Sequence, residues 1–442
     1  MNWPREYLKA IQSGDEVVSY KVRAVYEREV AWMADPDFFF YFDEEAGQRP
    51  IDFIERFCRH YEGEWAGQNI ELELFQKAKI QLVYGWKEKD TGFRRFREVI
   101  DIRGRKCGKS TETAGVELYA LIADDEGGAQ VWCTANKKDQ AKIIFNAAVA
   151  MRQQSPALKA ITKKRQSDIY FPATFSILGA QAADTKTMDG LNAHFFSLDE
   201  WHEARTRKVY DAMKQSQSAR RQPLAWLIST NGFVREAFFD DRYDYASQVA
   251  LWCDGFEDYR TLALIYELDS RDEWDKPECW AKANPGLGKI KSRETLAQWV
   301  EDAKRDPTAL PTVLTKDFNI PENSSQAWLP YEACVNETVV ADERLKHSYA
   351  IGGCDLSATT DLTCATLLIR KPDDDNFYVL QKYFLPEARV NTVEGNSARE
   401  APYRLWADQG WLHICEGSMV DYKAVTKWFL DQVKENDIRP LW

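Results

Sequence analysis

One short stretch constrains the fold of this chain more than any other feature of its sequence. It follows an apolar run, Val99–Ile102, precedes a stretch that permits a helix, and reads Arg103-Gly104-Arg105-Lys106-Cys107-Gly108-Lys109-Ser110. Between a strand and a helix, the backbone N–H groups of such a loop surround phosphates, Lys109 reaches the β and γ oxygens, and the Ser110 hydroxyl binds Mg²⁺. The sequence therefore predicts a phosphate-binding loop that runs into Thr111.

The loop departs from the full G-x-x-x-x-G-K-[ST] pattern. Arg103 stands at the first glycine position, and Gly104 follows one residue late. Gly-Lys-Ser alone is weak evidence, because an ordinary basic turn has the same residues. We expect Arg103 to serve the loop as a cation that acts in its own chain during phosphoryl transfer.

A second element strengthens this interpretation. The largely apolar run Ala193–Leu198 ends in Asp199 and Glu200. At the carboxyl edge of a strand, Asp199 can hold the hydration shell of Mg²⁺ while Glu200 orients and deprotonates the attacking water. An acidic pair that closes a strand is more often a solvated turn, but the loop and the pair together predict ATP hydrolysis. His202 is expected to pack or to form hydrogen bonds rather than to act in catalysis.

Two weaker features fit around this site. Gln76 precedes the loop, and its amide can give and take hydrogen bonds at an adenine edge, although a surface glutamine on an amphipathic helix has the same appearance. Ser229–Gly232 ends the next apolar run and can place hydroxyl and amide groups near the γ-phosphate, although alone it reads as a turn.

Strand-like runs alternate with helical stretches between residues 70 and 235, which is typical of a parallel α/β sheet. We expect a helical region at 1–65, an α/β domain with a helical part at 66–325, a linker at 326–345 and a second α/β domain at 346–442. The expected strands are Val99–Ile102, Val131–Thr134, His194–Leu198, Ala225–Ser229, Tyr349–Cys354, Thr363–Ile369, Phe377–Phe384 and Trp411–Cys415, with a helix over 421–436.

Composition excludes several classes of protein. The nine cysteines form no C-x-x-C pair and the five histidines show no H-x-x-x-H spacing, so no zinc site or disulfide framework is encoded. No window approaches the ~18 apolar residues of a membrane helix and no signal core is visible, so we expect a cytoplasmic protein with no membrane partner.

The net charge of −12 argues against a uniformly basic nucleic-acid coat but leaves a local basic channel open. The tryptophans are expected to fill cores rather than stack on bases.

In the order of its motifs, the chain resembles the large terminase subunits of tailed bacteriophages, the motors that package DNA into proheads. The resemblance implies an ASCE-type P-loop ATPase domain followed by an RNase H-like α/β nuclease domain, with ATP, Mg²⁺ and, in the nuclease, Mg²⁺ or Mn²⁺. The partners that it implies are double-stranded DNA, the portal protein of the prohead and the small terminase subunit. It also implies that copies of the chain assemble into a homo-oligomeric ring, taken as a pentamer, in the cytoplasm of the infected bacterial host. The segments that carry it are Leu72–Gln76, Arg103–Ser110, Thr134–Asn136 with Gln140–Ala141, Met188–Asn192 leading into Leu198–His202, Ser229–Gly232 and Gly352–Thr363.

By this likeness Gln76 contacts adenine, and Lys109 and Ser110 hold the phosphates and the metal ion. Glu200 is the catalytic base and Thr230 the residue that couples hydrolysis to movement. The family also needs a cation in phosphoryl transfer, often an arginine finger from a neighbouring subunit. The candidates for that finger are Arg205, Arg207, Arg220 and Arg221.

The same likeness makes Asp355 the first metal ligand of the nuclease. An acid at the end of the first strand of a meander, with further acids nearby, is what two-metal phosphodiester cleavage requires. The family takes other ligands from a later strand and a C-terminal helix, and Arg439–Trp442 looks like the start of a strand. Glu416 and Asp421 remain as candidates, although Asp421 is better explained as a helix N-cap. We therefore expect a partial nuclease domain, with the remaining ligands beyond Trp442.

Two other classes of protein stay open. A helicase-like or remodelling P-loop ATPase would share residues 70–235 and lack nuclease chemistry at Asp355. A non-enzymatic assembly adaptor would use both acidic sites structurally, and unchanged ATP turnover in Lys109→Ala would favour it.

Overall fold

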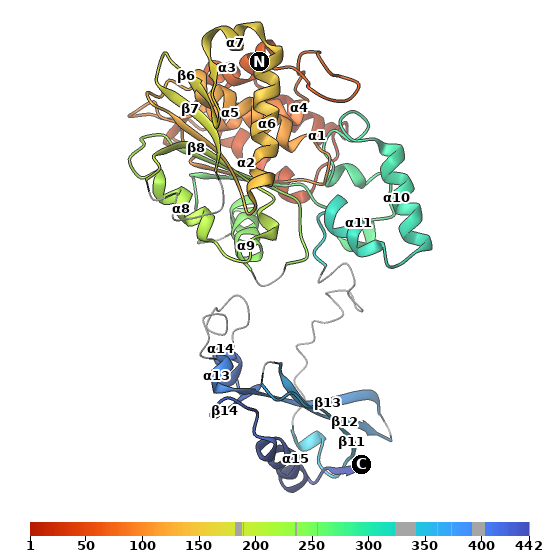
Figure 1. Ribbon diagram of the computed structural model, residues 1–442. Helices are drawn as coiled ribbons and strands as arrows, with labels where there is room; N and C mark the ends of the chain where they lie inside the picture. The colour runs from red at the N-terminus through yellow and green to blue at the C-terminus, as the bar shows by residue number, and fades with distance from the viewer. Residues whose placement is uncertain are drawn as a thin grey trace. The chain divides into compact units, whose positions relative to one another are not determined.

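The computed structural model describes residues 1–181, 188, 190–234, 237–253, 255–322, 342–359, 361–372, 374–390 and 403–441 (Figure 1). It divides into two compact units, Met1–Glu332 and Ala333–Trp442. Most of the linker expected at 326–345 lies outside the described residues, as does Asp189 of the Met188–Asn192 segment.

An eight-stranded sheet forms the centre of the first unit, in the order β10-β3-β9-β8-β4-β7-β6-β5. In this order, each strand from β10 through β7 is parallel to its neighbour. Strand β6 then pairs antiparallel with β7, and β5 pairs antiparallel with β6. The four strands expected from apolar runs are all present and are confirmed. The bounds are β3 Glu98–Ile102, β4 Gln130–Ala135, β5 Lys163–Lys164, β6 Asp168–Phe171, β7 Ser176–Gln181, β8 Ala193–Asp199, β9 Leu224–Ser229 and β10 Thr261–Ile265.

The central strands are apolar because helices cover the sheet. Every residue of β8 and of β9 is buried. Helices α5 (Lys109–Ile122) and α6 (Lys138–Gln154) pack against β4 and β7, and α9 (Phe238–Leu251) packs against β10. A parallel sheet that is buried on both faces reads as near-continuous apolar runs, which is why these strands were visible in the sequence.

The N-terminal helical region consists of α1 (Trp3–Ser13), α2 (Tyr20–Ala34) and α3 (Glu44–Phe57), and α4 (Leu74–Gly85) follows it. Buried side chains of these helices belong to the same hydrophobic cluster as those of the sheet. The helices therefore support the sheet. The largest fully buried side chains include three tryptophans, as expected of residues that fill a core, namely Trp86, Trp201 and Trp226.

A helical segment, residues 268–320, follows β10. It contains α10 (Arg293–Arg305) and α11 (Leu310–Asp317), preceded by two short 3₁₀ helices. Its buried side chains, among them Trp280 and Phe318, form a hydrophobic cluster distinct from that of the sheet. This part of the chain is therefore a small compact body attached to the α/β core, and we call it the helical segment.

The second unit contains a five-stranded sheet in the order β14-β13-β12-β11-β15. Strands β11, β12 and β13 form the expected antiparallel meander, and β15 pairs in parallel with β11. Asp421 caps α15 (Tyr422–Asn436) by accepting a hydrogen bond from the Lys423 N–H, so the N-cap prediction is confirmed. The strands are β11 Tyr349–Asp355, β12 Thr363–Lys371, β13 Asp374–Pro386, β14 Leu412–Cys415 and β15 Arg439–Leu441.

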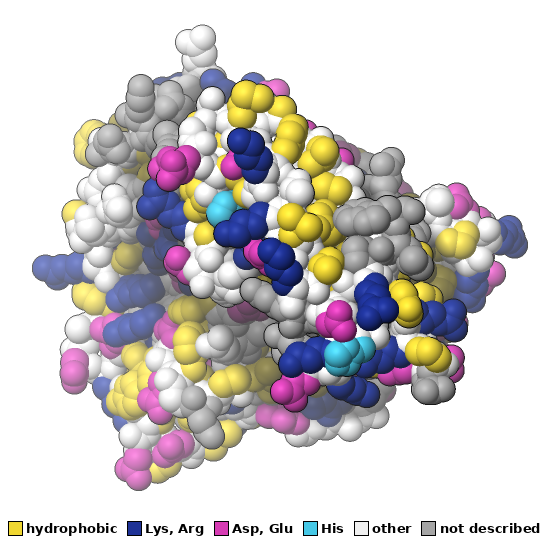
Figure 2. Space-filling model, turned by 90° about the horizontal axis from the view of Figure 1, so that it is seen from below, with side chains coloured by type: hydrophobic (Ala, Val, Ile, Leu, Met, Phe, Trp, Pro, Cys, Tyr) yellow, Lys and Arg dark blue, Asp and Glu magenta, His cyan; other side chains and the backbone are white. Residues whose placement is uncertain are grey.

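Two surface properties bear on the partners of the chain. Within the ranges given above, no helix has both the length and the apolar character needed to cross a membrane. Figure 2 shows a face on which Lys and Arg side chains lie among Asp and Glu side chains. The acidic net charge therefore does not correspond to a uniformly acidic surface.

Candidate active site

The phosphate-binding loop connects the end of β3 to the start of α5, as the sequence predicts. Lys106 and Gly108 have left-handed backbone conformations, with φ of 62° and 75°. Gly108 is the N-cap of α5, and Ser110 and Thr111 lie in the first turn of that helix. The loop therefore leads into a helix N-terminus, whose unpaired N–H groups are suited to bind an anion.

Gly104 is the point at which the helical segment meets the loop. Its N–H group donates to the carbonyl oxygen of Ala283 at 2.9 Å, and a Cβ on Gly104 would lie 2.4 Å from Oδ1 of Asn284. The next N–H group, that of Arg105, donates to the carbonyl oxygen of Lys316 at 2.9 Å. Close approach of the two segments therefore explains the late glycine of the loop.

Arg103 lies inside the fold. Its Nη2 atom is 2.8 Å from Oδ2 of Asp101 and 2.8 Å from Oε2 of Glu112, and its side chain is fully buried. Burial acts to lower the pKa of Arg103, but the two carboxylates outweigh it and raise that pKa, so the guanidinium stays charged. The sequence suggested that Arg103 acts on the phosphates, whereas both of its ion pairs lie within the core. The exposed cations of the loop are Arg105 and Lys106, while Cys107 is buried.

Side chains of α4 join this buried cluster of charges. Nε2 of Gln76 donates to Oε2 of Glu112 at 3.1 Å, and its Oε1 accepts from the N–H group of Glu73 at 2.9 Å. Lys79 forms ion pairs with both Asp101 and Glu112. Gln76 thus lies beside the loop. The sequence analysis missed Lys79, Asp101 and Glu112, although a charged residue inside an apolar strand run, as Asp101 is in β3, was a visible signal.

Lys109 brings the loop and the acidic pair together. Its Nζ atom donates to the carbonyl oxygens of Arg103 at 2.8 Å and of Gly104 at 3.1 Å, and its side chain is buried. Burial lowers the pKa of Lys109, and the negative charges of Glu200 and Asp199 oppose that effect. Lys109 is therefore within electrostatic reach of both acids, as a single phosphate site requires.

The two adjacent acids at the end of β8 differ in their electrostatics. Burial and then the charge of Glu200 raise the pKa of Asp199 to about 7, and Gln140 donates to Asp199 at 3.2 Å. Burial also acts to raise the pKa of Glu200, but the hydrogen bond and charge of His202, with Lys109, lower it to about 2. Glu200 has a left-handed backbone, with φ of 48°, which is uncommon for a glutamate. Glu200 is therefore ionised at neutral pH, whereas Asp199 needs a nearby cation to be fully ionised.

His202 is buried between three elements. Its Nδ1 atom lies 2.9 Å from Oε2 of Glu200 and 2.9 Å from Oγ of Ser229, and its Nε2 atom lies 2.7 Å from Nζ of Lys316 in α11. The expectation that His202 forms hydrogen bonds is confirmed. Lys316 was missed, because nothing near it in the sequence marks a contact with a residue so distant along the chain.

Ser229–Gly232 connects the end of β9 to the helical segment. The N–H group and the side-chain amide of Asn231 donate to Oδ1 and to the carbonyl oxygen of Asn319, at 2.8 and 2.9 Å. The hydroxyl of Thr230 is buried and has no hydrogen-bond partner among the residues that the structure describes. This hydroxyl is therefore buried and uncommitted among these residues.

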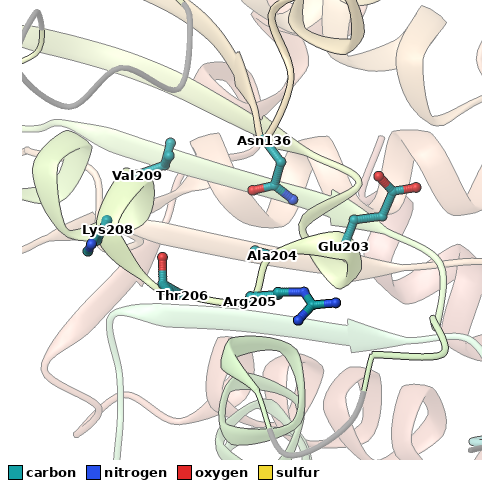
Figure 3. A pocket seen from close by; sticks show the side chains of 7 residues that line it. All are labelled: Asn136, Glu203, Ala204, Arg205, Thr206, Lys208 and Val209. Carbon is teal, nitrogen blue, oxygen red and sulfur yellow. The ribbon is translucent and has the colours of Figure 1, made fainter. Parts of the chain in front are cut away.

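The four arginines considered as fingers differ in their contacts. Arg220 donates to a glutamate and to three backbone carbonyl groups, and Arg207 pairs with an aspartate of its own helix. Arg205 and Arg221 are exposed, and Arg205 has no ion pair within the described ranges. Arg205 also borders a cavity of about 260 Å³ (Figure 3). The residues that line the cavity are Asn136, Glu203, Ala204, Arg205, Thr206, Lys208 and Val209.

Asp355 ends β11 in the second unit and is exposed. The described part of the chain contains no group of three or more His, Cys, Asp or Glu side chains placed to hold a metal ion. The N–H group of Asp361 donates to the Ser357 hydroxyl. The structure therefore places Asp355 where a first-strand ligand is expected, without further ligands gathered around it among these residues.

Two family descriptions match the chain. Residues 74–248 match "Terminase large subunit, ATPase domain", and residues 256–434 match "Terminase large subunit, endonuclease domain". The boundary between these matches differs from that between the compact units, because Thr261–Ile265 forms β10 of the first sheet. We place the structural boundary after the helical segment, since the pairing of β10 with β3 is a direct contact.

Individual relatives agree with these matches. The chain is 31% identical over 394 residues to the terminase large subunit of Enterobacteria phage HK97, covering 86% of this chain and 73% of that protein. It is 29% identical over 263 residues to protein YmfN of Escherichia coli strain K12, covering 57% of this chain and 56% of that protein. The crystal structure of the HK97 bacteriophage large terminase superposes with a TM-score of 0.55 at 27% identity, over 89% of this chain and 78% of that one. The chain therefore belongs to the large terminase subunits and carries the ATPase and endonuclease domains of that family.

Proposed function

We propose that this chain hydrolyses ATP to drive double-stranded DNA into a prohead and cuts concatemeric DNA when packaging begins and ends. The observation that carries the proposal is that the loop after β3 and the acids at the end of β8 leave the same carboxyl edge of a parallel sheet, each beside β9. The charges of Asp199 and Glu200 also act on Lys109. Membership of the terminases supports DNA packaging as the purpose of this hydrolysis. The match to an endonuclease domain favours it over a helicase-like or remodelling ATPase.

In this proposal the N–H groups of the loop and Lys109 bind the phosphates of ATP, and Ser110 and Asp199 hold Mg²⁺. The donors fit that ion, because Mg²⁺ prefers hard oxygen ligands and a cation would favour the ionised form of the buried Asp199. Bound Mg²⁺ supplies charge neutralisation at the β and γ phosphates. Glu200, ionised at neutral pH, takes a proton from the attacking water.

The remaining groups of the site have supporting roles. We assign Gln76 to the adenine and Thr230, through its uncommitted hydroxyl, to sensing hydrolysis. We assign Arg103 to holding the loop, because both of its ion pairs lie within the core, and Arg105 is the exposed loop cation available to the phosphates. Arg205 is the favoured finger toward a neighbouring subunit, since it is exposed and borders a cavity.

The proposed partners are double-stranded DNA, the portal protein of the prohead, the small terminase subunit and further copies of this chain in a pentameric ring. The proposed location is the cytoplasm of the infected bacterial host. For DNA cutting we assign Asp355 as a ligand of Mg²⁺ or Mn²⁺. Its place at the end of β11, the first strand of the meander, supports this assignment.

ATP turnover of the wild type, Lys109→Ala and Glu200→Gln, with and without double-stranded DNA and proheads, tests the ATPase site. Both variants should lose at least about 100-fold in rate. Lys142→Ala, which alters an exposed lysine of α6, is the matched control and should behave as the wild type. Undiminished turnover in Lys109→Ala would refute the site.

Plasmid cleavage with Mg²⁺ or Mn²⁺ tests the nuclease assignment. In a protein that carries the complete nuclease domain, Asp355→Asn should abolish metal-dependent cutting while ATP turnover stays at the wild-type rate, because Asp355 belongs to the second unit and the ATPase residues to the first. Metal-dependent cutting that survives the substitution would show that Asp355 is not a required ligand.

A further inference from the structure

His202 joins the proposed catalytic base to the helical segment. Its side chain is almost fully buried and contacts Glu200 at the end of β8, Ser229 at the end of β9 and Lys316 in α11. Gly232 packs against the ring, since a Cβ at that position would lie 2.4 Å from Cδ2 of His202. Polar contacts and close packing therefore hold the imidazole in one orientation.

Lys316 determines which ring nitrogen carries the proton. Burial, together with the nearby charge of Arg105, lowers the pKa of Lys316 to about 8, so the ammonium form prevails at neutral pH. An ammonium group only donates hydrogen bonds, so Nε2 of His202, 2.7 Å away, must accept. The proton of the neutral ring is then on Nδ1, which forms a hydrogen bond with Oγ of Ser229 and lies 2.9 Å from Oε2 of Glu200.

This arrangement leaves one oxygen of Glu200 for catalysis. Oε2 lies 2.9 Å from Nδ1 of His202, whereas Oε1 has no hydrogen bond or ion pair with the residues that the structure describes. In the hydrolysis step a water proton passes to Oε1, the water oxygen bonds to the γ-phosphorus, and the bond from that phosphorus to the β,γ-bridging oxygen breaks. A general base must present its oxygen to the water in a defined direction. That direction depends on His202 and, through it, on Lys316.

We propose that Lys316 and His202 are positioning residues that orient Glu200, so that full ATPase activity requires the helical segment to be docked on the loop. The inference rests on the proposed role of Glu200 as the base. The carbonyl oxygen of Lys316 also accepts the N–H group of Arg105 at 2.9 Å. One residue of α11 thus contacts both the phosphate loop and the imidazole beside the base, and withdrawal of α11 removes both contacts together.

Lys316→Met tests the proposal, because it keeps an aliphatic side chain and removes the donor. We expect kcat for ATP to fall about tenfold. This loss is smaller than the full rate enhancement of a general base, because Glu200 stays present but is less well oriented. KM for ATP and the affinity for a fluorescent ATP analogue should change less than about twofold. Lys316→Arg restores a cationic donor and should recover most of kcat. Lys304→Met, which alters an exposed lysine of α10, is the matched control and should behave as the wild type.

A double-mutant cycle separates positioning from general support. His202→Ala should lower kcat at least as much as Lys316→Met does, and the double variant should be no slower than His202→Ala, because Lys316 acts through the imidazole. Additive effects would overturn the proposal. So would wild-type kcat in Lys316→Met, equal losses in Lys316→Met and Lys316→Arg, or loss of analogue binding in Lys316→Met.

Glu200→Gln distinguishes failure of this inference from failure of the proposed function. If Glu200→Gln turns over ATP at the wild-type rate, Glu200 is not the base, and both the proposed mechanism and the inference are wrong. If Glu200→Gln is inactive while Lys316→Met is fully active, only the positioning role is wrong.

Discussion

Replacing Glu117 by glutamine tests how the core beneath the acidic pair is held together. Glu117 lies on α5, is fully buried, and accepts hydrogen bonds from Oγ of Ser197 at 2.6 Å and Sγ of Cys133 at 2.9 Å. It has no ion pair within the described parts of the chain. Burial raises the pKa of Glu117 to about 7, against the two hydrogen bonds, and the charge of Asp199 adds to the rise. We predict that Glu117→Gln, which keeps the shape and removes the charge, stabilises the protein at alkaline pH far more than at acidic pH.

The size of the effect follows from proton linkage. The carboxyl of Glu117 has a pKa of about 7 in the folded protein and 4.5 as a reference for the unfolded chain. Because the folded value is the higher one, the stability that this group contributes is fully present below pH 4.5 and is lost as the pH rises through 7. The difference between the two values corresponds to about 3 kcal/mol of unfolding free energy above that range. Most of this loss should be absent in Glu117→Gln.

Urea unfolding of both proteins checks this prediction. The stability of Glu117→Gln relative to the wild type should rise by about 2 kcal/mol between about pH 5.5 and about pH 8. Asp199 titrates in the same range, but it is present in both proteins and largely cancels in the difference. Asp139→Asn, at an exposed carboxylate of α6, should show no such pH-dependent difference. A stability difference between Glu117→Gln and the wild type that does not change with pH would refute the reasoning.

Three further experiments test the surroundings of the loop. Arg103→Met leaves two buried carboxylates without this partner and should lower the free energy of unfolding in urea by about 3–5 kcal/mol. Arg105→Met, at an exposed position, should lower it by less than about 0.5 kcal/mol. Equal losses in the two variants would contradict the assigned roles. Gly104→Ala puts a methyl group 2.4 Å from Oδ1 of Asn284, so amide exchange in the helical segment should quicken while exchange in the central strands does not. Above about pH 8 Lys316 loses the charge that fixes the tautomer of the His202 imidazole. The kcat for ATP of the wild type should therefore fall above that pH, whereas the kcat of Lys316→Arg should persist because arginine stays charged. Parallel pH profiles of kcat in the two proteins would contradict this prediction.

The parts of the fold that were predictable have local signals. The loop is recognisable because glycine, lysine and serine stand together between a strand and a helix, and β8 and β9 because burial on both faces makes them continuously apolar. Thr261–Ile265 is as apolar as those strands, yet its place beside β3 was not predictable. That place depends on a pairing between segments that are far apart in the sequence, for which one sequence carries no periodic signal.

The candidate site shows the same division. The pattern put Arg103 in the loop, but the direction of its side chain depends on Asp101 and Glu112, which attract it into the core. Lys316 could not be found at all, because its contact with His202 exists only once the helical segment docks. Local motifs therefore identified the groups for the chemistry, whereas the groups that orient them come from tertiary contacts.

The pairing of β10 with β3 determines how the protein can be divided into working fragments. A fragment that ends near residue 255, where the two family matches meet, would lose β10 and expose β3 as an open sheet edge, which invites aggregation. It would also lose the carbonyl groups of Ala283 and Lys316 that accept the loop N–H groups. A fragment that extends through residue 322 keeps both neighbours of β3 and the support of the loop. The recombinant ATPase module should therefore be cut after the helical segment, and shorter pieces should express as insoluble protein.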